Sequence, residues 1–249
     1  MKYQLEVIAF TIDCCRVIEA AGAHRIELCD NPCEGGTTPS YGLLRAARGR
    51  VGIELAPMIR PRGGDFLYSD AEFEVMKSDV LKCRDLGCDA VVLGLLCADG
   101  TVDRERTARL AELAYPLDLV FHRAFDRVRD PEEALETLVG IGCTRILTSG
   151  LQPTVTEGAA TLARLVEQAG DRLTIMPGSG VRSSNLAQLV QQTGARAFHT
   201  SARTTAASGM EYHNPSLQEN LLHVRADATE IQNCLQVLQE WHLNRETNK

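Results

Sequence analysis

The chain has 249 residues, of which 44% are hydrophobic and 24% charged, a composition typical of a soluble globular protein. Its 26 basic and 33 acidic residues give a net charge of −7, and no Lys/Arg-rich run offers the phosphate contacts of a nucleic-acid binder. No apolar stretch approaches the roughly 18 residues of a membrane helix, and the N-terminus has no leader cleavage site. We therefore expect a cytoplasmic protein whose partners are neither nucleic acid nor membrane.

A short pattern occurs four times along the chain. Residues 22–28, 87–93, 142–148 and 194–200 each begin with Gly and a small residue and continue as an apolar run. The Gly predicts a helix end in the left-handed conformation, directly before a strand. Four further apolar runs, at residues 4–10, 51–59, 117–122 and 172–176, are typical of strands buried on both faces. The sequence therefore predicts eight strands.

Helix-start signals lie between these strands. Ser69 with Glu72, and Thr154 with Glu157, have the spacing of capping boxes, and Asp130 precedes a proline at a first helical turn. Alternating strands and helices predict a parallel sheet, and the absence of a glycine-rich fingerprint after the first strand favours a closed barrel over a nucleotide-binding open sheet. The predicted fold is a single α/β domain over residues 1–249, a TIM-like (β/α)8 barrel.

The chain beyond the eighth strand is predicted to hold a polar loop at residues 204–216 and a last helix at about 227–243. One apolar stripe of that helix is interpreted as core or subunit interface. Its members are Ile231, Leu235, Leu238 and Trp241.

Functional groups of such a barrel lie on the loops after the carboxyl ends of the strands. Arg60 and Arg62 follow the third strand with the same parity, so both are candidates to bind carboxylate or phosphate at the barrel mouth. Arg123, after the fifth strand, is a further anion-binding candidate. Asp65 is either an acid–base group or the partner of Arg62 in a salt bridge that holds the loop.

Small polar turns after the seventh and eighth strands predict a second anion site, because backbone N–H groups at such turns bind phosphate in many barrels. A lone Gly-Ser-Gly sequence is often only a turn, but here it neighbours a second polar turn. The candidate residues are Gly178, Ser179, Gly180, Thr200 and Ser201.

Three residues are candidates for proton transfer. Glu27 shares strand parity with Arg25, so it should point into the barrel, where a buried carboxylate needs a partner. Its alternative role is an interior ion pair that only stabilises the barrel. His122 and His199 end the fifth and eighth strands, positions suited to general acid–base catalysis.

Several segments resemble signature runs of the CutC family, which is named for copper homeostasis. They are residues 25–29, 34–40, 60–66, 121–126 and 147–150, and the match extends in the same order from about residue 5 to 213. The resemblance implies a TIM-like barrel, a cytosolic protein, a role in copper handling and a homo-oligomer, and we expect the last helix to be its contact surface. It implies no known reaction.

Copper handling makes Cu(I) a candidate ligand, since Cu(I) prefers thiolate and thioether groups. Cys29 and Cys33 are the candidate metal ligands, with Met58 or Cys97 as further soft donors. Most of the nine cysteines are nevertheless expected to be small buried hydrophobic residues, because no Cys-x-x-Cys pair occurs.

Three positions depart from the family pattern. Some members resemble this chain but carry Cys in place of Ile8, Gly in place of Ser179 and an acidic residue in place of Ala197. Two hypotheses follow from the sequence. One is a copper-handling protein that binds Cu(I), and the alternative is a barrel enzyme that acts on a small phosphorylated or carboxylated metabolite by general acid–base chemistry.

Overall fold

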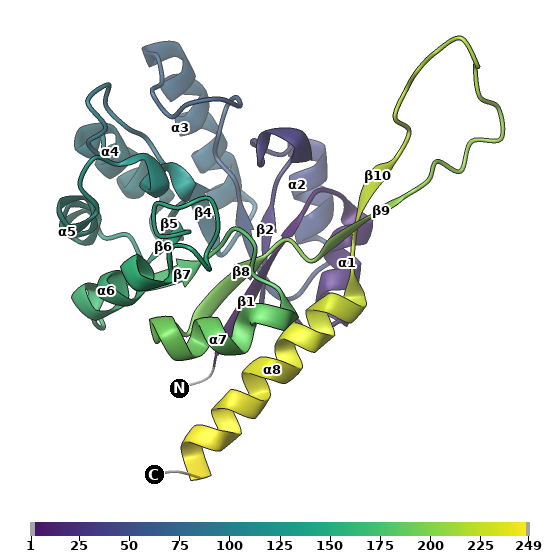
Figure 1. Ribbon diagram of the computed structural model, residues 1–249. Coiled ribbons are helices and arrows are strands. Elements are labelled where there is room, and N and C mark those ends of the chain that lie inside the picture. The colour runs from purple at the N-terminus through teal and green to yellow at the C-terminus, as the bar shows by residue number, and fades with distance from the viewer. Residues whose placement is uncertain (1–2, 248–249) are drawn as a thin grey trace.

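The computed structural model describes residues 3–247, with side chains as far as residue 243. Strands and helices alternate along the chain (Figure 1). The first eight strands are β1 (Gln4–Ala9), β2 (Arg25–Leu28), β3 (Glu54–Pro57), β4 (Ala90–Leu93), β5 (Asp118–Phe121), β6 (Arg145–Thr148), β7 (Thr174–Pro177) and β8 (Ala197–Thr200). The α-helices that follow them in turn are α1 (Ile12–Ala20), α2 (Tyr41–Arg48), α3 (Asp70–Asp85), α4 (Arg104–Ala114), α5 (Pro131–Ile141), α6 (Ala159–Ala169), α7 (Ser183–Thr193) and α8 (Ala228–Thr247). Short 3-10 helices lie at Pro32–Glu34 and Arg123–Arg127.

Two of the three predicted helix starts are confirmed. Ser69 Oγ accepts a hydrogen bond from the Glu72 amide and the Glu72 carboxylate accepts one from the Ser69 amide, which is a complete capping box for α3. Asp130 caps α5 by accepting a hydrogen bond from the Glu133 amide, and Pro131 is the first residue of that helix. The third prediction is wrong, because Thr154 and Glu157 bond to each other in a turn and α6 begins only at Ala159.

All eight strands run parallel, in two half-sheets of order β3-β2-β1-β8 and β4-β5-β6-β7. The halves meet between β3 and β4 through a parallel bridge from Met58 to Val92, where the Ile59 amide donates to the Val92 carbonyl at 2.7 Å. On the other side β7 lies beside β8, so close that a Cβ at Gly178 would be 3.4 Å from that of His199. The strands thus follow one another in the order of a TIM barrel, and the predicted TIM-barrel-like fold is confirmed.

Strand parity divides the core into two parts. One apolar cluster lies between the strands and the helices, where residues such as Val7, Ile26 and Leu55 are fully buried. A second, smaller cluster fills the barrel interior, with Val92 and Met176 among its members. Alternate positions of each strand therefore face the interior, and this alternation places the residues of the site.

The end of the chain differs from the prediction. The expected polar loop is instead part of an antiparallel hairpin of β9 (Arg203–Ala206) and β10 (His223–Ala226). Residues 207–222 between them, called the arm below, extend away from the barrel (Figure 1). Helix α8 starts one residue later than expected and buries Ile231 and Leu238 against its own barrel, so this part of its apolar stripe is core. No helix within residues 3–247 has both the length and the hydrophobicity to cross a membrane.

Candidate functional site

A buried network of charges occupies the centre of the barrel. The strand register places Glu6 of β1 opposite Arg25 of β2 on one side and His199 of β8 on the other. Glu6 Oε2 lies 2.8 Å from Arg25 Nε, and Glu6 Oε1 lies 2.8 Å from His199 Nδ1. Burial alone would raise the pKa of Glu6, but the His199 hydrogen bond and the Arg25 charge outweigh it and lower that pKa. Glu6 is therefore ionised at neutral pH inside the barrel.

Glu6 was not among the predicted site residues. The sequence nevertheless contained a signal, because Glu6 is a charged residue within an apolar strand. A carboxylate in a strand that is buried on both faces needs a partner of opposite charge. Arg25 forms ion pairs with both Glu6 and Glu54, and the Glu54 Oε2 atom lies 3.2 Å from Arg25 Nη1. The interior ion pair with an arginine, which was the alternative role for Glu27, is thus formed by Glu6 and Arg25.

Glu27 points into the barrel as its strand parity predicts and is almost fully buried. Burial is the main cause that raises its pKa to about 7, and the nearby Glu6 carboxylate adds to the rise, while the charge of His199, a hydrogen bond with Cys29 and the charge of Arg25 oppose it. Its Oε2 lies 3.8 Å from His199 Nε2, and its Oε1 has no hydrogen-bond partner within residues 3–247. Glu27 is therefore a carboxyl group that can both accept and return a proton near neutral pH.

His199 lies between the two carboxylates. Burial would lower its pKa, but the charge of Glu27 and the hydrogen bond to Glu6 together raise it above its ordinary value. A charged imidazolium donates from Nδ1 to Glu6 and presents Nε2 towards Glu27. The ring thus links a fixed carboxylate to a titrating one.

His122 has the opposite character. Its Nδ1 accepts a hydrogen bond from the Ala124 amide at 3.1 Å, so the proton of the neutral ring is on Nε2. Burial, followed by the charges of Arg60 and Arg123, lowers its pKa to about 3. Its Nε2 is buried without a hydrogen-bond partner in the described part of the chain. His122 therefore offers a neutral N–H donor to whatever occupies the space beside it.

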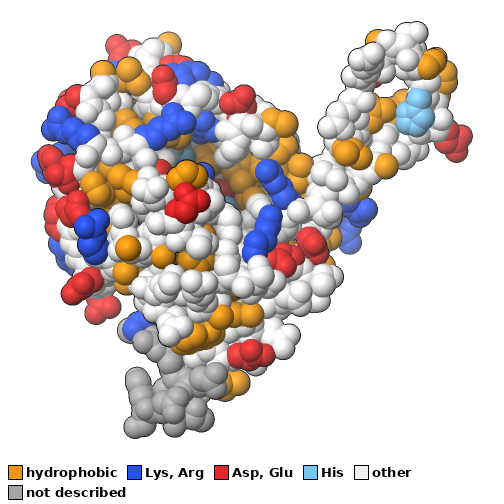
Figure 2. Space-filling view, in the orientation of Figure 1, with side chains coloured by type: hydrophobic (Ala, Val, Ile, Leu, Met, Phe, Trp, Pro, Cys, Tyr) orange, Lys and Arg blue, Asp and Glu red, His pale blue; other side chains and the backbone are white. Residues whose placement is uncertain are grey.

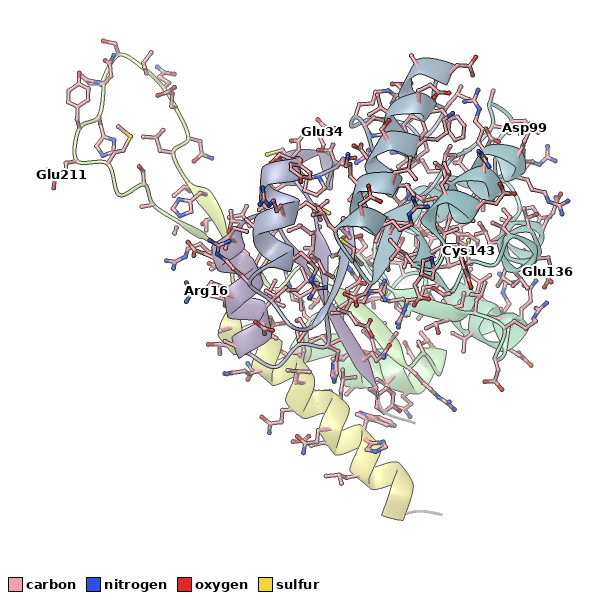
Figure 3. All side chains as sticks on the ribbon, turned by 180° about the vertical axis from the view of Figure 1, so that it is seen from behind. Arg16, Glu34, Asp99, Glu136, Cys143 and Glu211 are labelled. Atoms are coloured by element: carbon pink, nitrogen blue, oxygen red, sulfur yellow. The ribbon has the colours of Figure 1, made fainter. Side chains whose placement is uncertain are left out.

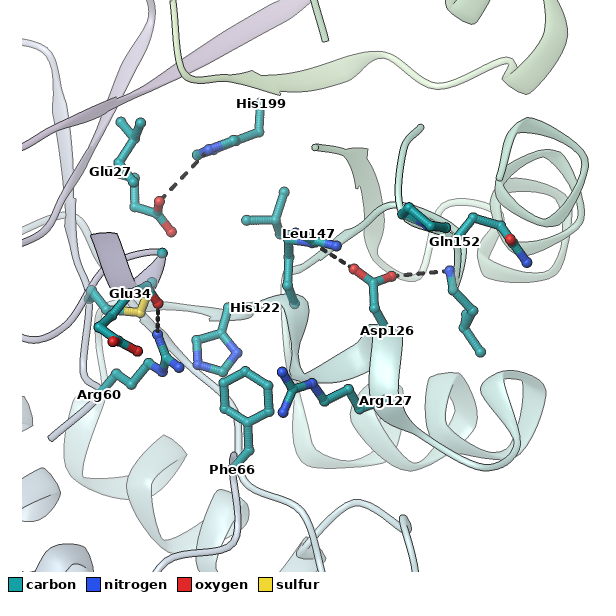
Figure 4. Close-up of a pocket in the computed structure, with 16 residues that line it drawn as sticks. Glu27, Glu34, Arg60, Phe66, His122, Asp126, Arg127, Leu147, Gln152 and His199 are labelled. Carbon is teal, nitrogen blue, oxygen red and sulfur yellow. Dashed lines mark hydrogen bonds and ion pairs between the residues drawn. The ribbon is translucent and has the colours of Figure 1, made fainter. Parts of the chain in front are cut away.

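That space is a cavity of about 370 Å³ at the carboxyl ends of the strands. Glu27, His122 and His199 all border it, and Figure 4 shows them facing the same region from three strands. The remaining lining residues are Ile8, Glu34, Gly35, Met58, Arg60, Phe66, Arg123, Asp126, Arg127, Leu147, Leu151, Gln152 and Pro153. The sequence-predicted proton-transfer residues of strands two, five and eight are thus brought together in one pocket of small-molecule size.

The two predicted arginines of the third strand have separate surroundings. Arg60 borders the cavity, but its guanidinium donates to the carbonyls of Glu34 at 2.7 Å, Gly36 at 2.8 Å and Gly64 at 3.1 Å. Arg62 lies outside the cavity lining and pairs with Asp65 at 2.9 Å. Arg60 thus ties two loops together, and Arg62 with Asp65 has the geometry of the loop-holding salt bridge.

A second pair of arginines borders the cavity beyond β5. Arg123 Nε donates to Asp126 at 2.7 Å, and Asp126 also accepts from Thr148 Oγ1 and from the Ser149 amide. Arg127 lies over the Phe66 ring at 5.1 Å. Arg123 was predicted, whereas Arg127 was missed, because it falls outside the motif that ends at residue 126.

The small polar turns after β7 and β8 lie outside the cavity lining. Ser179 Oγ donates to the Pro153 carbonyl at 2.9 Å, and Thr200 Oγ1 donates to the Val181 carbonyl at 2.8 Å. Gly178 packs beneath His199, where a Cβ would also lie 2.4 Å from Leu147. These contacts hold the loops around the mouth in place. The cavity lining also lacks the remaining members of the predicted anion site, Gly180 and Ser201.

The cysteines are mostly buried, as expected. Seven of the nine are buried and all are free, while Cys33 and Cys97 are exposed. Residues 3–247 contain no group of three or more His, Cys, Asp or Glu side chains arranged to hold a metal ion. Cys29 nevertheless has a soft neighbour, because a Cβ at Gly36 would lie 2.9 Å from Cys29 Sγ and 3.6 Å from Met58 Cε.

Comparison with known proteins defines the family. The model of the CutC family matches residues 3–204, well over half of the chain. The chain belongs to the CutC family. The CutC family protein of Chromobacterium violaceum is 57% identical over 208 residues, which is 84% of each chain. A human relative named copper homeostasis protein cutC homolog is 46% identical over 215 residues, 86% of this chain and 79% of the relative.

Solved structures agree with the fold. The crystal structure of a CutC protein from Streptococcus agalactiae superposes with a TM-score of 0.77 at 38% identity, over 80% of this chain and 98% of that one. A phosphoribosylanthranilate isomerase from Thermotoga maritima, at 12% identity, has a TM-score of 0.58 over 96% of this chain and 99% of its own. The latter similarity shows the barrel fold alone.

The contacts of Arg60 generate a stability prediction. Arg60→Met should lower the free energy of unfolding by about 2–4 kcal/mol, because three loop carbonyls lose a charged donor in a buried place. Arg123→Met, at a half-exposed arginine with a rim ion pair, should cost about 1 kcal/mol or less. Urea denaturation measures both, and equal losses in the two variants would contradict the anchoring role of Arg60.

Proposed function

We propose that this protein has a role in copper handling in the cytoplasm, in keeping with the names of its relatives, and that its barrel mouth is an acid–base active site for a small anionic metabolite. One observation carries the second part. An unpartnered carboxylate oxygen of Glu27 and an unpartnered imidazole N–H of His122, both buried, border the same cavity. Buried polar atoms without partners are uncommon, and a pair facing one pocket indicates a polar ligand.

The two groups have complementary chemistry. With a pKa of about 7, Glu27 is partly ionised at neutral pH and suits a general base that later returns its proton. His122 stays neutral and donates from Nε2, which stabilises negative charge developing on a substrate oxygen without transferring a full charge. A base and a neutral donor on one substrate fit proton abstraction from a carbon next to a carbonyl group. Glu27 and His122 are the proposed catalytic residues.

His199 and Glu6 act as positioning residues in this proposal. The Glu6 carboxylate fixes the His199 ring through a 2.8 Å contact, and the ring faces Glu27 at 3.8 Å. A charged His199 stabilises ionised Glu27 and offsets part of the cost of its burial. Without that charge, Glu27 would stay protonated to higher pH and would be a poorer base at neutral pH.

The anionic part of the substrate is assigned to Arg123 and Arg127. Both side chains are exposed and border the cavity, so a carboxylate or phosphate reaches their guanidinium groups from solvent. Arg60 has its terminal nitrogens bound to loop carbonyls, and Arg62 lies outside the lining. A cavity of about 370 Å³ limits the ligand to a small molecule.

A ligand screen followed by hydrogen exchange tests this function. Small phosphorylated and carboxylated metabolites are first ranked by thermal shift, and the best carbonyl-containing hit is then incubated in D₂O and followed by NMR. The wild type should exchange the C–H next to the carbonyl, and Glu27→Gln should slow this exchange about 100-fold or more while still binding the ligand. Below pH 7 the wild-type rate should fall, because the base becomes protonated.

The matched variants separate binding from catalysis. Arg127→Met should raise the dissociation constant about tenfold, whereas Arg62→Met should change neither binding nor exchange, because only Arg127 borders the cavity. Exchange at the wild-type rate in Glu27→Gln would remove Glu27 as the base. Loss of binding in Arg62→Met but not in Arg127→Met would move the anion site away from the cavity.

A second candidate is direct Cu(I) binding, and the proximity of Cys29 and Met58 favours it. A thiol and a thioether are the ligands that Cu(I) prefers, and both lie under Gly36. The exposed Cys33, predicted as a further ligand, would have to move towards them. Burial raises the pKa of the Cys29 thiol well above its ordinary value, so Cu(I) must displace a firmly held proton.

Competition with a Cu(I) chelator tests this candidate. The wild type should take up one equivalent of Cu(I), Cys29→Ser should lose it, and Met58→Leu should bind at least tenfold more weakly. Cys33→Ser reports whether the predicted loop ligand takes part, and Cys143→Ser, at a buried cysteine outside the barrel mouth, is the control. Equal uptake by Cys29→Ser and the wild type would exclude the site.

A further inference from the structure

Helix α3 ends in a hydrogen-bonded turn that brings two cysteines together. The Gly87 amide donates to the Arg84 carbonyl at 3.0 Å, and the Cys88 amide donates to the Cys83 carbonyl at 3.1 Å. Gly87 is left-handed, with a φ of 70°. These bonds define a Schellman motif, in which the side chains of the first and sixth residues commonly contact each other. In this copy of the motif those two residues are Cys83 and Cys88.

The same motif closes two other helix-to-strand junctions of the repeat. At the end of α1 the Ala23 amide donates to the Ile18 carbonyl at 3.3 Å. At the end of α5 the Cys143 amide donates to the Leu138 carbonyl at 3.0 Å, and Figure 3 labels this cysteine. Of these three junctions, that of α3 alone has cysteines at both contacting positions. Cys143 is therefore an internal control, because it has the same backbone position with a leucine as its partner.

The two thiols form a hydrogen bond with each other. Both side chains are buried in the apolar cluster between the strands and the helices. The hydrogen bond from the Cys83 thiol, followed by the charge of Arg48, lowers the pKa of Cys88 against the effect of burial. The same hydrogen bond, followed by burial, raises the pKa of Cys83. Cys88 is therefore the thiol that ionises first, and Cys83 keeps its proton beside it.

Cys88 lies just beneath the surface of the barrel. Figure 2 shows many charged side chains on the outer face of the body, where α3 to α6 lie. Cys88 itself is 4% exposed, but its chain neighbours Gly87 and Asp89 are both exposed. The Cys88 sulfur is therefore at the boundary between core and solvent. It is within reach of a small neutral oxidant such as hydrogen peroxide and closed to a second protein.

We propose that Cys83 and Cys88 are a redox-active dithiol, which hydrogen peroxide converts into a reversible disulfide across the end of α3. The Cys88 sulfur attacks one peroxide oxygen, the O–O bond breaks, and the leaving hydroxide forms water with the Cys88 proton. The Cys83 sulfur then displaces the hydroxyl group of the Cys88 sulfenic acid, which leaves as water with the Cys83 proton. Two thiols and one peroxide thus give one disulfide and two water molecules, and a dithiol reductant reverses the change.

The dithiol adjoins the seam between the two half-sheets. Asp89, next to Cys88, accepts a hydrogen bond from the Leu55 amide of β3 at 2.8 Å and donates from its own amide to the Leu55 carbonyl at 3.1 Å. This contact and the bridge from Met58 to Val92 join β3 to β4. A disulfide from Cys88 to α3 would hold Asp89 in place and slow local opening of the seam. The inference is independent of the proposed reaction, because this seam contact lies at the amino ends of the strands, opposite the mouth.

Peptide mapping of the full-length chain tests the disulfide. The parent protein for this test carries Cys33→Ser and Cys97→Ser, which remove the two exposed thiols. Trypsin releases residues 83–84 and 85–104 as separate fragments, and in this parent Cys88 is the one cysteine of the longer fragment. Mass spectrometry should find the two fragments linked after treatment with hydrogen peroxide. The linked mass should disappear after reduction with dithiothreitol.

Matched variants assign the two roles. Cys83→Ala cannot close the disulfide, so its Cys88 sulfenic acid should persist and react with dimedone at least tenfold more than in the parent. Cys88→Ala should give neither the linked mass nor a dimedone adduct at Cys83. Cys143→Ala, at the matching position of the α5 junction, should leave the linked mass unchanged. Circular dichroism confirms that each variant is folded.

Hydrogen exchange measures the effect on the seam. The amides of Leu55 and Asp89 should exchange at least threefold more slowly in the oxidised parent than in the reduced one, and peroxide should leave them unchanged in Cys83→Ala. Equal exchange in the oxidised and reduced parent would overturn the effect on the seam. Two thiols that stay free in peroxide, a link from either to a third cysteine, or sulfinic acid at Cys88 without a crosslink would overturn the dithiol itself.

Discussion

The carboxylate of Glu6 is the constraint on which the interior of this barrel depends. It is buried, it lies between Arg25 and His199, and each contact joins β1 to a neighbouring strand. Removing one partner of such a pair leaves a buried charge uncompensated, at a cost of about 3–5 kcal/mol. The three strands are therefore held in one register by charge as well as by backbone hydrogen bonds, and β2 must present Glu27, its next inward residue, to the mouth.

Glu27 acquires its properties from the same network. Arg25 is paired with Glu6 and Glu54, so the charge nearest to Glu27 that opposes its burial is that of His199, and burial raises the pKa of Glu27 to about 7. His122, on the opposite half-sheet, is kept neutral by burial and by the charges of Arg60 and Arg123. Glu6, together with burial and the charges of Arg60 and Arg123, thus gives the mouth a fixed anion, a cation, a titrating acid and a neutral donor, the kind of separation that acid–base catalysis uses.

Much of this arrangement follows from the sequence. The repeated helix-to-strand junctions predict the order of strands, and period-two parity predicts that Glu27 faces inward, because both depend on local pattern. The hydrogen-bond partners of Arg60 were not predictable from the sequence. They include the backbone carbonyls of Glu34 and Gly64, which lie in two different loops that only the tertiary fold brings together. The same holds for Arg127, which its Phe66 contact places at the cavity, and for the arm, whose polar sequence does not reveal that residues 203–206 and 223–226 pair.

The most direct test is the position of the protons in the barrel mouth. Neutron diffraction from crystals grown in D₂O near pH 6 should show deuterium on His122 Nε2 and none on its Nδ1, while His199 carries deuterium on both ring nitrogens and Glu6 carries none. A His122 ring deuterated on Nδ1, or a neutral His199 beside a protonated Glu6, would contradict the account, because Glu27 and His122 would then lack the charge states from which their roles derive.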